Sequence, residues 1–182
     1  LYTYVVPVLE IDGQKQDGTG YKIATNIDEI NPRKIAKMGV DEALSKINSK
    51  SIETGNYKIA LYNEAMVSLL SAFCGVFSAD ATQKGLSLLK DKENTIIASE
   101  NVTIVDNPLL ENGLSSAPFD DEGVATFRKE IVSKGKLTTL LHNLKTAHKA
   151  NTKSTGNGFK SSYASSVSVS PSNFYIEKGD KS

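Results

Sequence analysis

Two histidines, His142 and His148, carry the side chains best suited to bind a metal ion or to transfer a proton near neutral pH. They are six positions apart, which places them on different faces of a helix, whereas a helical metal site uses positions i and i+4. No third ligand lies close to them in the sequence. We therefore interpret both as structural or surface histidines, with a metal or catalytic role as the alternative.

Three consecutive acids, Asp120, Asp121 and Glu122, precede Gly123 and offer the oxygen ligands that Ca²⁺ or Mg²⁺ prefers. An EF-hand loop would need further ligands at fixed offsets, and the sequence does not have them. We interpret this segment as an acidic turn before a strand expected at 125–132.

The segment Lys-Ser-Thr-Gly-Asn-Gly at 153–158 suggests a loop that cradles an anion. It lacks the glycine spacing followed by Lys and Ser/Thr that defines a nucleotide-binding P-loop. The alternative is a glycine turn that brings backbone N–H groups close to a peptide ligand. The serines form no G-x-S-x-G elbow, and Cys74 has no basic residue within four positions to stabilise a thiolate. These residue types alone indicate no enzyme site.

The composition is that of a neutral globular protein. Among 182 residues, 21 basic and 21 acidic side chains cancel, so no overall field favours nucleic acid or an anionic membrane. The longest apolar run, around 67–74, is well short of the ~20 residues of a membrane span. One cysteine excludes an internal disulfide, and no secretory signal opens the chain. We expect a cytoplasmic protein. Because the chain starts without Met inside a strand-like run, we also expect a fragment of a longer one.

The first quarter of the chain predicts a hairpin followed by a helix. Residues 2–10 alternate and are rich in Val and Tyr, and 19–25 reads as a second strand. Asn31-Pro32 predicts a helix start, because Asn caps a free N–H and Pro suits the first helical position. The apolar face of that helix is expected to contain Ala36, Val40, Ala43, Leu44 and Ile47. The polar segment 48–56 has no periodicity and marks a boundary between two units.

The remainder predicts a mixture of short strands and helices. We expect strands at 57–62, 101–105, 127–132, 137–141 and 173–177, and a helical segment within 141–150. A helix beginning after Asn63 is apolar nearly all round and is therefore expected to be buried on most sides. The serine-rich segment 161–172 predicts a loop or an irregular strand.

Charge is segregated despite the overall balance. Residues 100–122 carry six acids and no base, and residues 128–160 carry eight bases and one acid. We interpret the two segments as solvated surfaces that attract one another. The alternative is a basic groove for an acidic peptide or nucleic acid.

Several strings together resemble one family. Residues 110–124, which end in Ser-Ala-Pro-Phe-Asp-Asp-Glu-Gly-Val, resemble the Ser/Ala-x-Pro-Phe-Asp-x-Glu-Gly-Val stretch of the TldD/PmbA family. Lys-Ser-Thr-Gly-Asn at 153–157 resembles its Ser/Pro-Thr-Gly-Asn/His stretch. Residues 57–75 are similar to the strand and helix that open the family's C-terminal domain, and 2–47 to the end of its N-terminal domain. The resemblance implies an α+β fold of mixed sheets with packed helices. It also implies that residues 1–52 are the end of an N-terminal α/β-type domain and that residues 53–182 are the start of a β-rich C-terminal domain.

The family's catalytic members, the TldD type, are zinc metallopeptidases with His-Glu-x-x-x-His on this helix. Two imidazoles hold the zinc, and the Glu acts as base toward the metal-bound water. Alignment with that motif puts Ser71 and Val76 at the His positions and Ala72 at the Glu position. None of these three side chains can bind zinc as His does or act as a base as Glu does. The loss of the motif resembles the PmbA (TldE) branch, whose members lack it. The motif position is expected to be filled by packing instead.

The resemblance implies a non-catalytic subunit of a zinc metallopeptidase complex that processes or degrades unfolded peptides. The implied partners are a TldD-type subunit and a peptide, with a homodimer as an alternative assembly and no nucleic-acid or membrane partner. Zinc is expected only in the TldD-type partner, with no cofactor in this chain. The chain would close a cavity around the partner's zinc and supply strand edges for extended peptide. The matching motifs imply substrate-binding residues at Asp120, Glu122, Gly123, Thr155, Gly156 and Asn157.

Two other functions stay open. One is a regulatory protein that modulates DNA gyrase or binds nucleic acid, supported only by the basic segment 128–160. The other is an active metallopeptidase whose metal ligands lie beyond Ser182.

Overall fold

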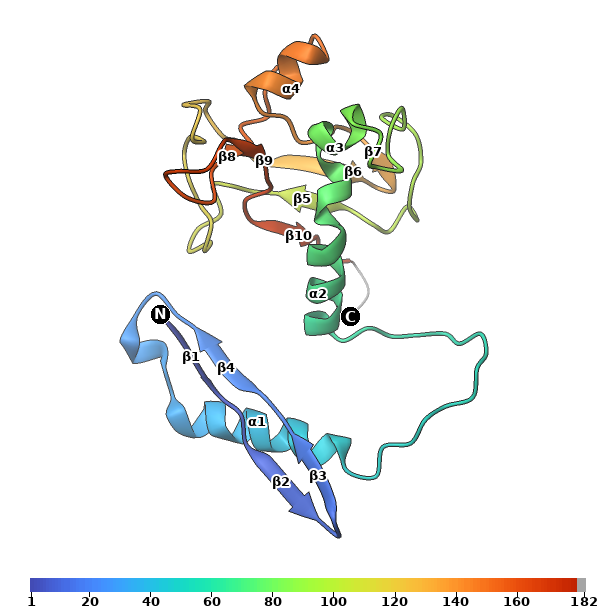
Figure 1. Ribbon diagram of the computed structural model, residues 1–182, viewed down its shortest axis with the longest axis vertical. Helices are drawn as coiled ribbons and strands as arrows, with labels where there is room; N and C mark the ends of the chain where they lie inside the picture. Colours follow the sequence, from blue (N-terminus) through green and yellow to red (C-terminus); the bar gives the residue numbers. More distant parts are fainter. Residues whose placement is uncertain (180–182) are drawn as a thin grey trace. The chain divides into compact units, whose positions relative to one another are not determined.

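The computed structural model describes residues 1–179, which fall into two compact units, residues 1–59 and residues 60–179 (Figure 1). The sequence places the boundary between 52 and 53. Each unit combines helices with small antiparallel sheets, which confirms the α+β class. Among the described helices, none has the length and apolar character needed to cross a membrane.

The first unit contains the expected hairpin, divided into two ladders. Strand β1 (Tyr2–Val5) pairs with β4 (Gly20–Ile23), and β2 (Val8–Ile11) pairs with β3 (Gln14–Asp17), all antiparallel. Between the ladders Pro7 accepts a hydrogen bond from Gly18 N at 3.2 Å. Pro7 has no N–H to donate, so regular pairing cannot continue through it. Asp12 and Gly13 both have positive φ (49° and 77°), the conformation of the tight turns that join strands with two-residue loops.

Helix α1 (Pro32–Lys46) packs on this hairpin and begins where its sequence signals predict. The side chain of Asn31 accepts from Lys34 N at 3.1 Å. A 3₁₀ turn, η1 (Ile27–Glu29), precedes the helix. The buried helical positions are Ile35, Gly39 and Ala43. The face differs from the expected one, since Ala36 and Leu44 are exposed. The close approach of the hairpin explains the shift, because a Cβ on Gly20 would lie 1.9 Å from Ile35 O.

The second unit is built on a four-stranded antiparallel sheet in the order β10-β5-β6-β7. Its strands are β5 (Ile104–Asp106), β6 (Lys129–Ser133), β7 (Lys136–Leu137) and β10 (Phe174–Ile176). A second ladder joins β8 (Gly158–Phe159) to β9 (Ser168–Val169). Of these two strands, β9 lies inside the serine-rich segment. The helical elements are α2 (Asn63–Phe73), the 3₁₀ turn η2 (Cys74–Phe77), α3 (Ala79–Gln83) and α4 (Leu144–Lys149).

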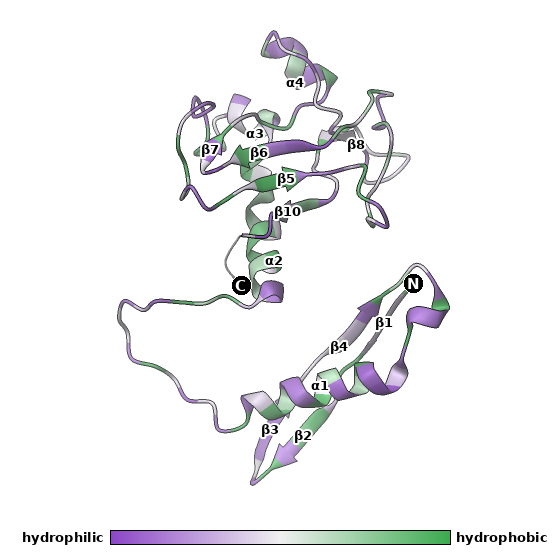
Figure 2. Cartoon of the chain, turned by 180° about the vertical axis from the view of Figure 1, so that it is seen from behind, coloured by the Kyte–Doolittle hydropathy of each residue, from purple (hydrophilic) through white to green (hydrophobic). Residues whose placement is uncertain are grey.

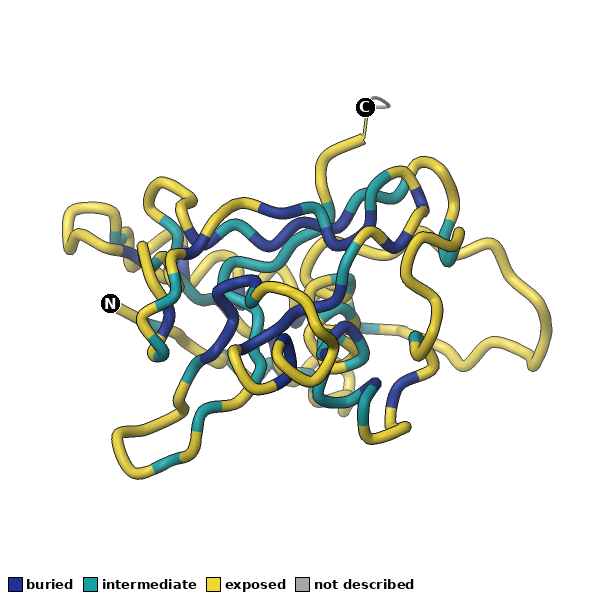
Figure 3. Tube along the Cα trace, turned by 90° about the horizontal axis from the view of Figure 1, so that it is seen from above, coloured by how far each residue is buried: buried dark blue, intermediate teal, exposed yellow. Residues whose placement is uncertain are grey.

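One hydrophobic core holds the second unit together (Figure 3). It joins residues of η2, α3 and the sheet to the segment that follows β7. The fully or nearly fully buried members are Phe77, Ala79, Ile104, Ile131, Val132, Leu137, Leu140 and Leu141. The expected strand pair 127–132 and 137–141 is shorter in the structure, because β7 contains only Lys136–Leu137.

Two expectations for the start of this unit are wrong. Residues 57–62 form no strand and are exposed, and no described strand pairs with them. Helix α2 is largely hydrophobic, as Figure 2 shows, yet none of its residues is buried. Only Met66 and Leu70 are partly covered, because α2 has a neighbour on one side only among the described residues. The apolar pattern predicted a buried helix, and the structure instead leaves an open hydrophobic surface.

Candidate functional site

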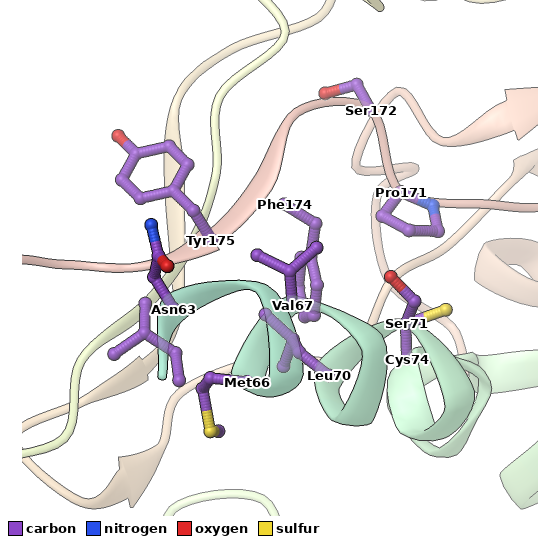
Figure 4. Close-up of a pocket in the computed structure, with 11 residues that line it drawn as sticks. Asn63, Met66, Val67, Leu70, Ser71, Cys74, Pro171, Ser172, Phe174 and Tyr175 are labelled. Atoms are coloured by element: carbon purple, nitrogen blue, oxygen red, sulfur yellow. The ribbon is translucent and has the colours of Figure 1, made fainter. Parts of the chain in front are cut away.

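An open groove of about 400 Å³ lies between helix α2 and strand β10 (Figure 4). The helical side contributes positions with the spacing of one helix face, namely Asn63, Met66, Val67, Leu70, Ser71 and Cys74. The opposite side is formed by Pro171, Ser172, Phe174, Tyr175 and Ile176. None of the lining side chains is an acid, Lys, Arg or His. The groove therefore offers apolar contact and a few neutral polar groups.

Helix α2 is fixed in place by a few contacts along one edge. Leu70 packs against the core of the unit, and Val76 of η2 does the same. Val67 faces the groove and is 62% exposed. Cys74, the one cysteine of the sequence, lines the far end of this face and is partly exposed. The groove therefore has a base that packs on the core and an exposed helical wall.

Strand β10 is an edge strand, because β5 is its one partner among the described strands. Asn107 N donates to Asn173 O at 2.9 Å, and Glu177 N donates to Thr103 O at 2.8 Å. Bonding pairs alternate along an antiparallel ladder, so the N–H and C=O groups of Phe174 and Ile176 point away from β5. Within residues 1–179 these outward groups have no backbone partner. The groove thus ends at a free strand edge.

The three positions aligned with the zinc motif have different surroundings in the structure. Ser71 lines the groove, Ala72 is exposed outside the groove lining, and Val76 packs on the core. The α-helix ends at Phe73, so Val76 belongs to the following 3₁₀ turn. In the described part of the chain no group of three or more His, Cys, Asp or Glu side chains could hold a metal ion. A hydroxyl, a methyl group and an isopropyl group do not fit zinc.

The acidic motif forms a closed turn. Asp120 Oδ1 accepts from Glu122 N at 3.0 Å and Val124 N at 2.9 Å, and Asp120 Oδ2 accepts from Gly158 N at 2.9 Å. Gly123 has φ +77°, which a side chain would strain. Asp120 is 2% exposed, so its carboxylate acts inside the fold.

The Thr-Gly-Asn motif lies beside that turn. Thr155 Oγ1 accepts from His142 N and donates to Asn157 Oδ1, both at 2.7 Å. Gly156 has φ +69°, and a Cβ there would lie 2.9 Å from Ala125 O. The motif therefore needs glycine for both backbone conformation and space.

A buried carboxylate that the sequence reasoning missed, Asp106, completes this network. Its Oδ2 accepts from Lys129 Nζ at 3.0 Å and Asn157 Nδ2 at 2.8 Å. Its Oδ1 accepts from the N and Oγ atoms of Ser172 at 2.8 and 2.7 Å. Burial lowers the pKa of Lys129, and the charges of Asp106 and Asp120 act in the opposite direction. The acidic and basic segments meet in this ion pair, but the pair is buried and not on the solvated surfaces that the sequence analysis expects.

The structure thus brings the six predicted substrate-binding residues close together, but their side chains and backbone groups bond to other residues of the fold. Glu122 Oε2 accepts from Leu144 N at 2.7 Å, which fixes the start of α4. Asn157 is fully buried, and Thr155 is 8% exposed. None of the six lines the groove between α2 and β10. The network stabilises the loops around the sheet, and substrate binding by these residues stays a prediction.

The two histidines have different environments. His142 is 5% exposed, and its Nδ1 has no hydrogen-bond partner among the described residues. Burial lowers the pKa of His142, and the charge of Glu93 partly opposes this. His148 is exposed near the end of α4. The structural and surface interpretations describe them well.

The chain resembles a known family along most of its length. Residues 54–182 match the model of the PmbA/TldA metallopeptidase C-terminal domain. A metalloprotease PmbA homolog of Buchnera aphidicola is 31% identical over 147 residues, covering 80% of this chain and 33% of the relative.

Two solved structures share the fold. A crystal structure of a candidate modulator of a DNA gyrase from Thermotoga maritima is 38% identical, with a TM-score of 0.91, and covers 100% of this chain and 41% of that one. TldE from Thermococcus kodakarensis has a TM-score of 0.74 at 23% identity, and the match covers 100% of this chain and 41% of that one. The chain therefore spans about a third to two fifths of the length of these relatives. The extent of the family match and the shared fold show that this chain belongs to the PmbA/TldD metallopeptidase family.

Proposed function

We propose that this chain is a PmbA/TldE-like, non-catalytic subunit of a TldD/PmbA-type zinc metallopeptidase complex that processes unfolded peptides in the cytoplasm. The observation that carries the proposal is the chemistry of α2 and η2, where the resemblance to the zinc motif puts Ser71, Ala72 and Val76 at the positions of the zinc ligands and the base. The partner supplies zinc and the activated water. This chain supplies a wall and a strand edge for peptide.

The groove supports this division of labour. Its lining contains no acid or histidine that could act as a general base and no cation that could stabilise an oxyanion. It contains apolar side chains and a strand edge with unpaired backbone groups, which is what sequence-tolerant peptide capture needs. The geometry of the groove is therefore suited to holding a peptide and unsuited to cleaving one.

Three preparations test the proposal: the purified chain, a TldD-type partner, and both together, each assayed for zinc content and for cleavage of an unfolded peptide. We expect no stoichiometric zinc and no cleavage with this chain alone. We expect faster cleavage when both are present than with the partner alone. The control adds the chain carrying Val67→Lys, which changes the groove wall and leaves the partner intact. Stoichiometric zinc in the isolated chain, or cleavage by it, contradicts the proposal.

A further inference from the structure

We propose that the buried side chains of Lys129 and Asn157 join in a covalent amide cross-link, with Asp106 moving the protons. In this reaction the amine nitrogen of Lys129 replaces the amide nitrogen of Asn157, and one ammonia leaves. The ion pair between Lys129 and Asp106 is the state before the bond forms. The inference goes beyond the proposed function and does not depend on it, because the reaction needs no zinc, no partner and no peptide.

One carboxylate oxygen holds both reacting groups. Asp106 Oδ2 accepts from Lys129 Nζ at 3.0 Å and from Asn157 Nδ2 at 2.8 Å, so the amine and the amide are neighbours at a single atom. Asp106 and Asn157 are fully buried, and Lys129 is 6% exposed. Holding two reactants side by side turns a bimolecular encounter into an intramolecular step, which lowers the barrier. Burial also keeps out water that would compete with the amine.

The carboxylate in contact with Lys129 can convert its ammonium group into a nucleophilic amine. Burial lowers the pKa of Lys129. The charges of Asp106 and Asp120 and the ring of Phe127, whose centroid is 4.8 Å from Nζ, favour the charged form instead. Transfer of one proton from Nζ to Asp106 removes both charges from the interior and leaves a free amine beside the amide.

The amide of Asn157 is oriented and polarised for attack. Its oxygen, Oδ1, accepts from Thr155 Oγ1 at 2.7 Å, and this donor stabilises the negative charge that develops there during attack. Its nitrogen, Nδ2, donates to Asp106 Oδ2 and to Ser170 O at 2.8 and 3.0 Å. The carboxyl group of Asp106 is therefore placed to give a proton to the nitrogen that leaves.

The atoms and protons of the reaction balance. Asp106 takes one proton from the Lys129 ammonium, and the electron pair of Nζ forms a bond to Cγ of Asn157. As the bond from Cγ to Nδ2 breaks, Nδ2 keeps the electron pair and takes the proton held by Asp106, which then takes a second proton from Nζ. The products are ammonia, a secondary amide and a protonated Asp106. Escape of ammonia and removal of a buried ion pair, which carries a desolvation cost, favour the products.

Mass spectrometry of the folded chain tests the inference. We expect an intact mass that is lower than the sequence mass by one molecule of ammonia. Trypsin cleaves after Lys and Arg, so digestion should release residues 129–134 joined to residues 154–160, without cleavage at Lys129. Chain that has never folded, held in guanidinium chloride, is the control. It should have the full sequence mass and lose ammonia only after refolding, because only the fold brings the three side chains together.

Two lysine variants locate the bond. Lys129→Met removes the attacking amine, and we expect complete loss of the joined peptide. Lys136→Met is the matched control, because Lys136 is exposed in a neighbouring strand of the same sheet. The joined peptide should form in this variant as it does in the unchanged chain.

The inference is overturned if the folded, unchanged chain keeps its full sequence mass after prolonged incubation. It is also overturned if ammonia is lost but the two tryptic peptides are not joined. Asn112 is exposed and precedes Gly113, so its side chain can lose ammonia by closing a ring with the backbone, and that product joins no two peptides. The unchanged chain decides the question alone, so the test stands even if Lys129→Met does not fold.

Discussion

Replacing Asp106 by Asn should destabilise the second unit strongly, because Asp106 is the acceptor at the centre of the buried network. The substitution keeps the size of the side chain and removes its charge. Asp106 is fully buried, and Lys129 is 6% exposed. Asn therefore leaves the ammonium group of Lys129 in the interior without its ion-pair partner, and only the charge of Asp120 still acts on it. It also gives an amide N–H₂ to a position where four donor groups converge.

The size of the effect follows from burial. Removing one partner of a buried ion pair costs about 3–5 kcal/mol. With a urea m-value of about 2 kcal/mol/M, the unfolding midpoint should fall by roughly 1.5–2.5 M. Glu177→Gln is the matched control, because Glu177, next to the end of β10, pairs at 2.8 Å with Arg128, next to the start of β6, but is 44% exposed. An exposed pair contributes only about 0–1 kcal/mol.

Urea titration read by hydrogen exchange at β5 and β6 measures the second unit separately from the first. A double variant, Asp106→Leu with Lys129→Met, removes both charges and should recover part of the loss. The recovery should be incomplete, because Asn157 and Ser172 still lose their acceptor. The reasoning is refuted if Asp106→Asn costs no more than Glu177→Gln.

Three further predictions concern other parts of the chain. The pKa of His142 is lowered in the folded state, so its contribution to stability should be present above pH ~6.5 and be lost as pH falls below that value. In unfolding measured as a function of pH, His142→Gln should reduce this loss of stability at acidic pH. Gly156→Ala should cost about 1–3 kcal/mol because of its positive φ and the nearby carbonyl, whereas Gly75→Ala, with nothing within 4 Å of the added Cβ, should be close to neutral in the same urea titration. Asn31→Ala should destabilise the first unit by ~1 kcal/mol through loss of the helix cap, read as faster hydrogen exchange in α1, and Asn31→Asp should retain the cap.

Features that depend on local chemistry could be predicted from the sequence. Helix α1 begins at the expected residue because Asn31 and Pro32 act on their own helix. The turn between β6 and β7 lies between the strands expected at 127–132 and 137–141, because Lys134 and Gly135 adopt the positive φ angles that a tight hairpin requires. The strand expected at 57–62 is absent because a strand needs a partner, and none of the described strands lies beside it.

The candidate site depends on contacts that the sequence does not reveal. Asp106 meets Lys129, Asn157 and Ser172 across separations of 23, 51 and 66 residues. In the sequence around Asp106, the only indication of this role is that an acidic residue ends a short apolar run. The sequence shows that α2 is apolar nearly all round, but periodicity cannot distinguish a helix packed in a core from one that lines an open groove.

The most direct test of the central claim is the origin of zinc and activity in the assembled complex. The chain is purified together with a TldD-type partner in which the metal-binding histidines have been replaced, and zinc content and peptide cleavage are compared with those of the unchanged pair. The account predicts that both are lost, because Ser71, Ala72 and Val76 provide no substitute ligands or base. Zinc and cleavage that persist in the altered pair would contradict it.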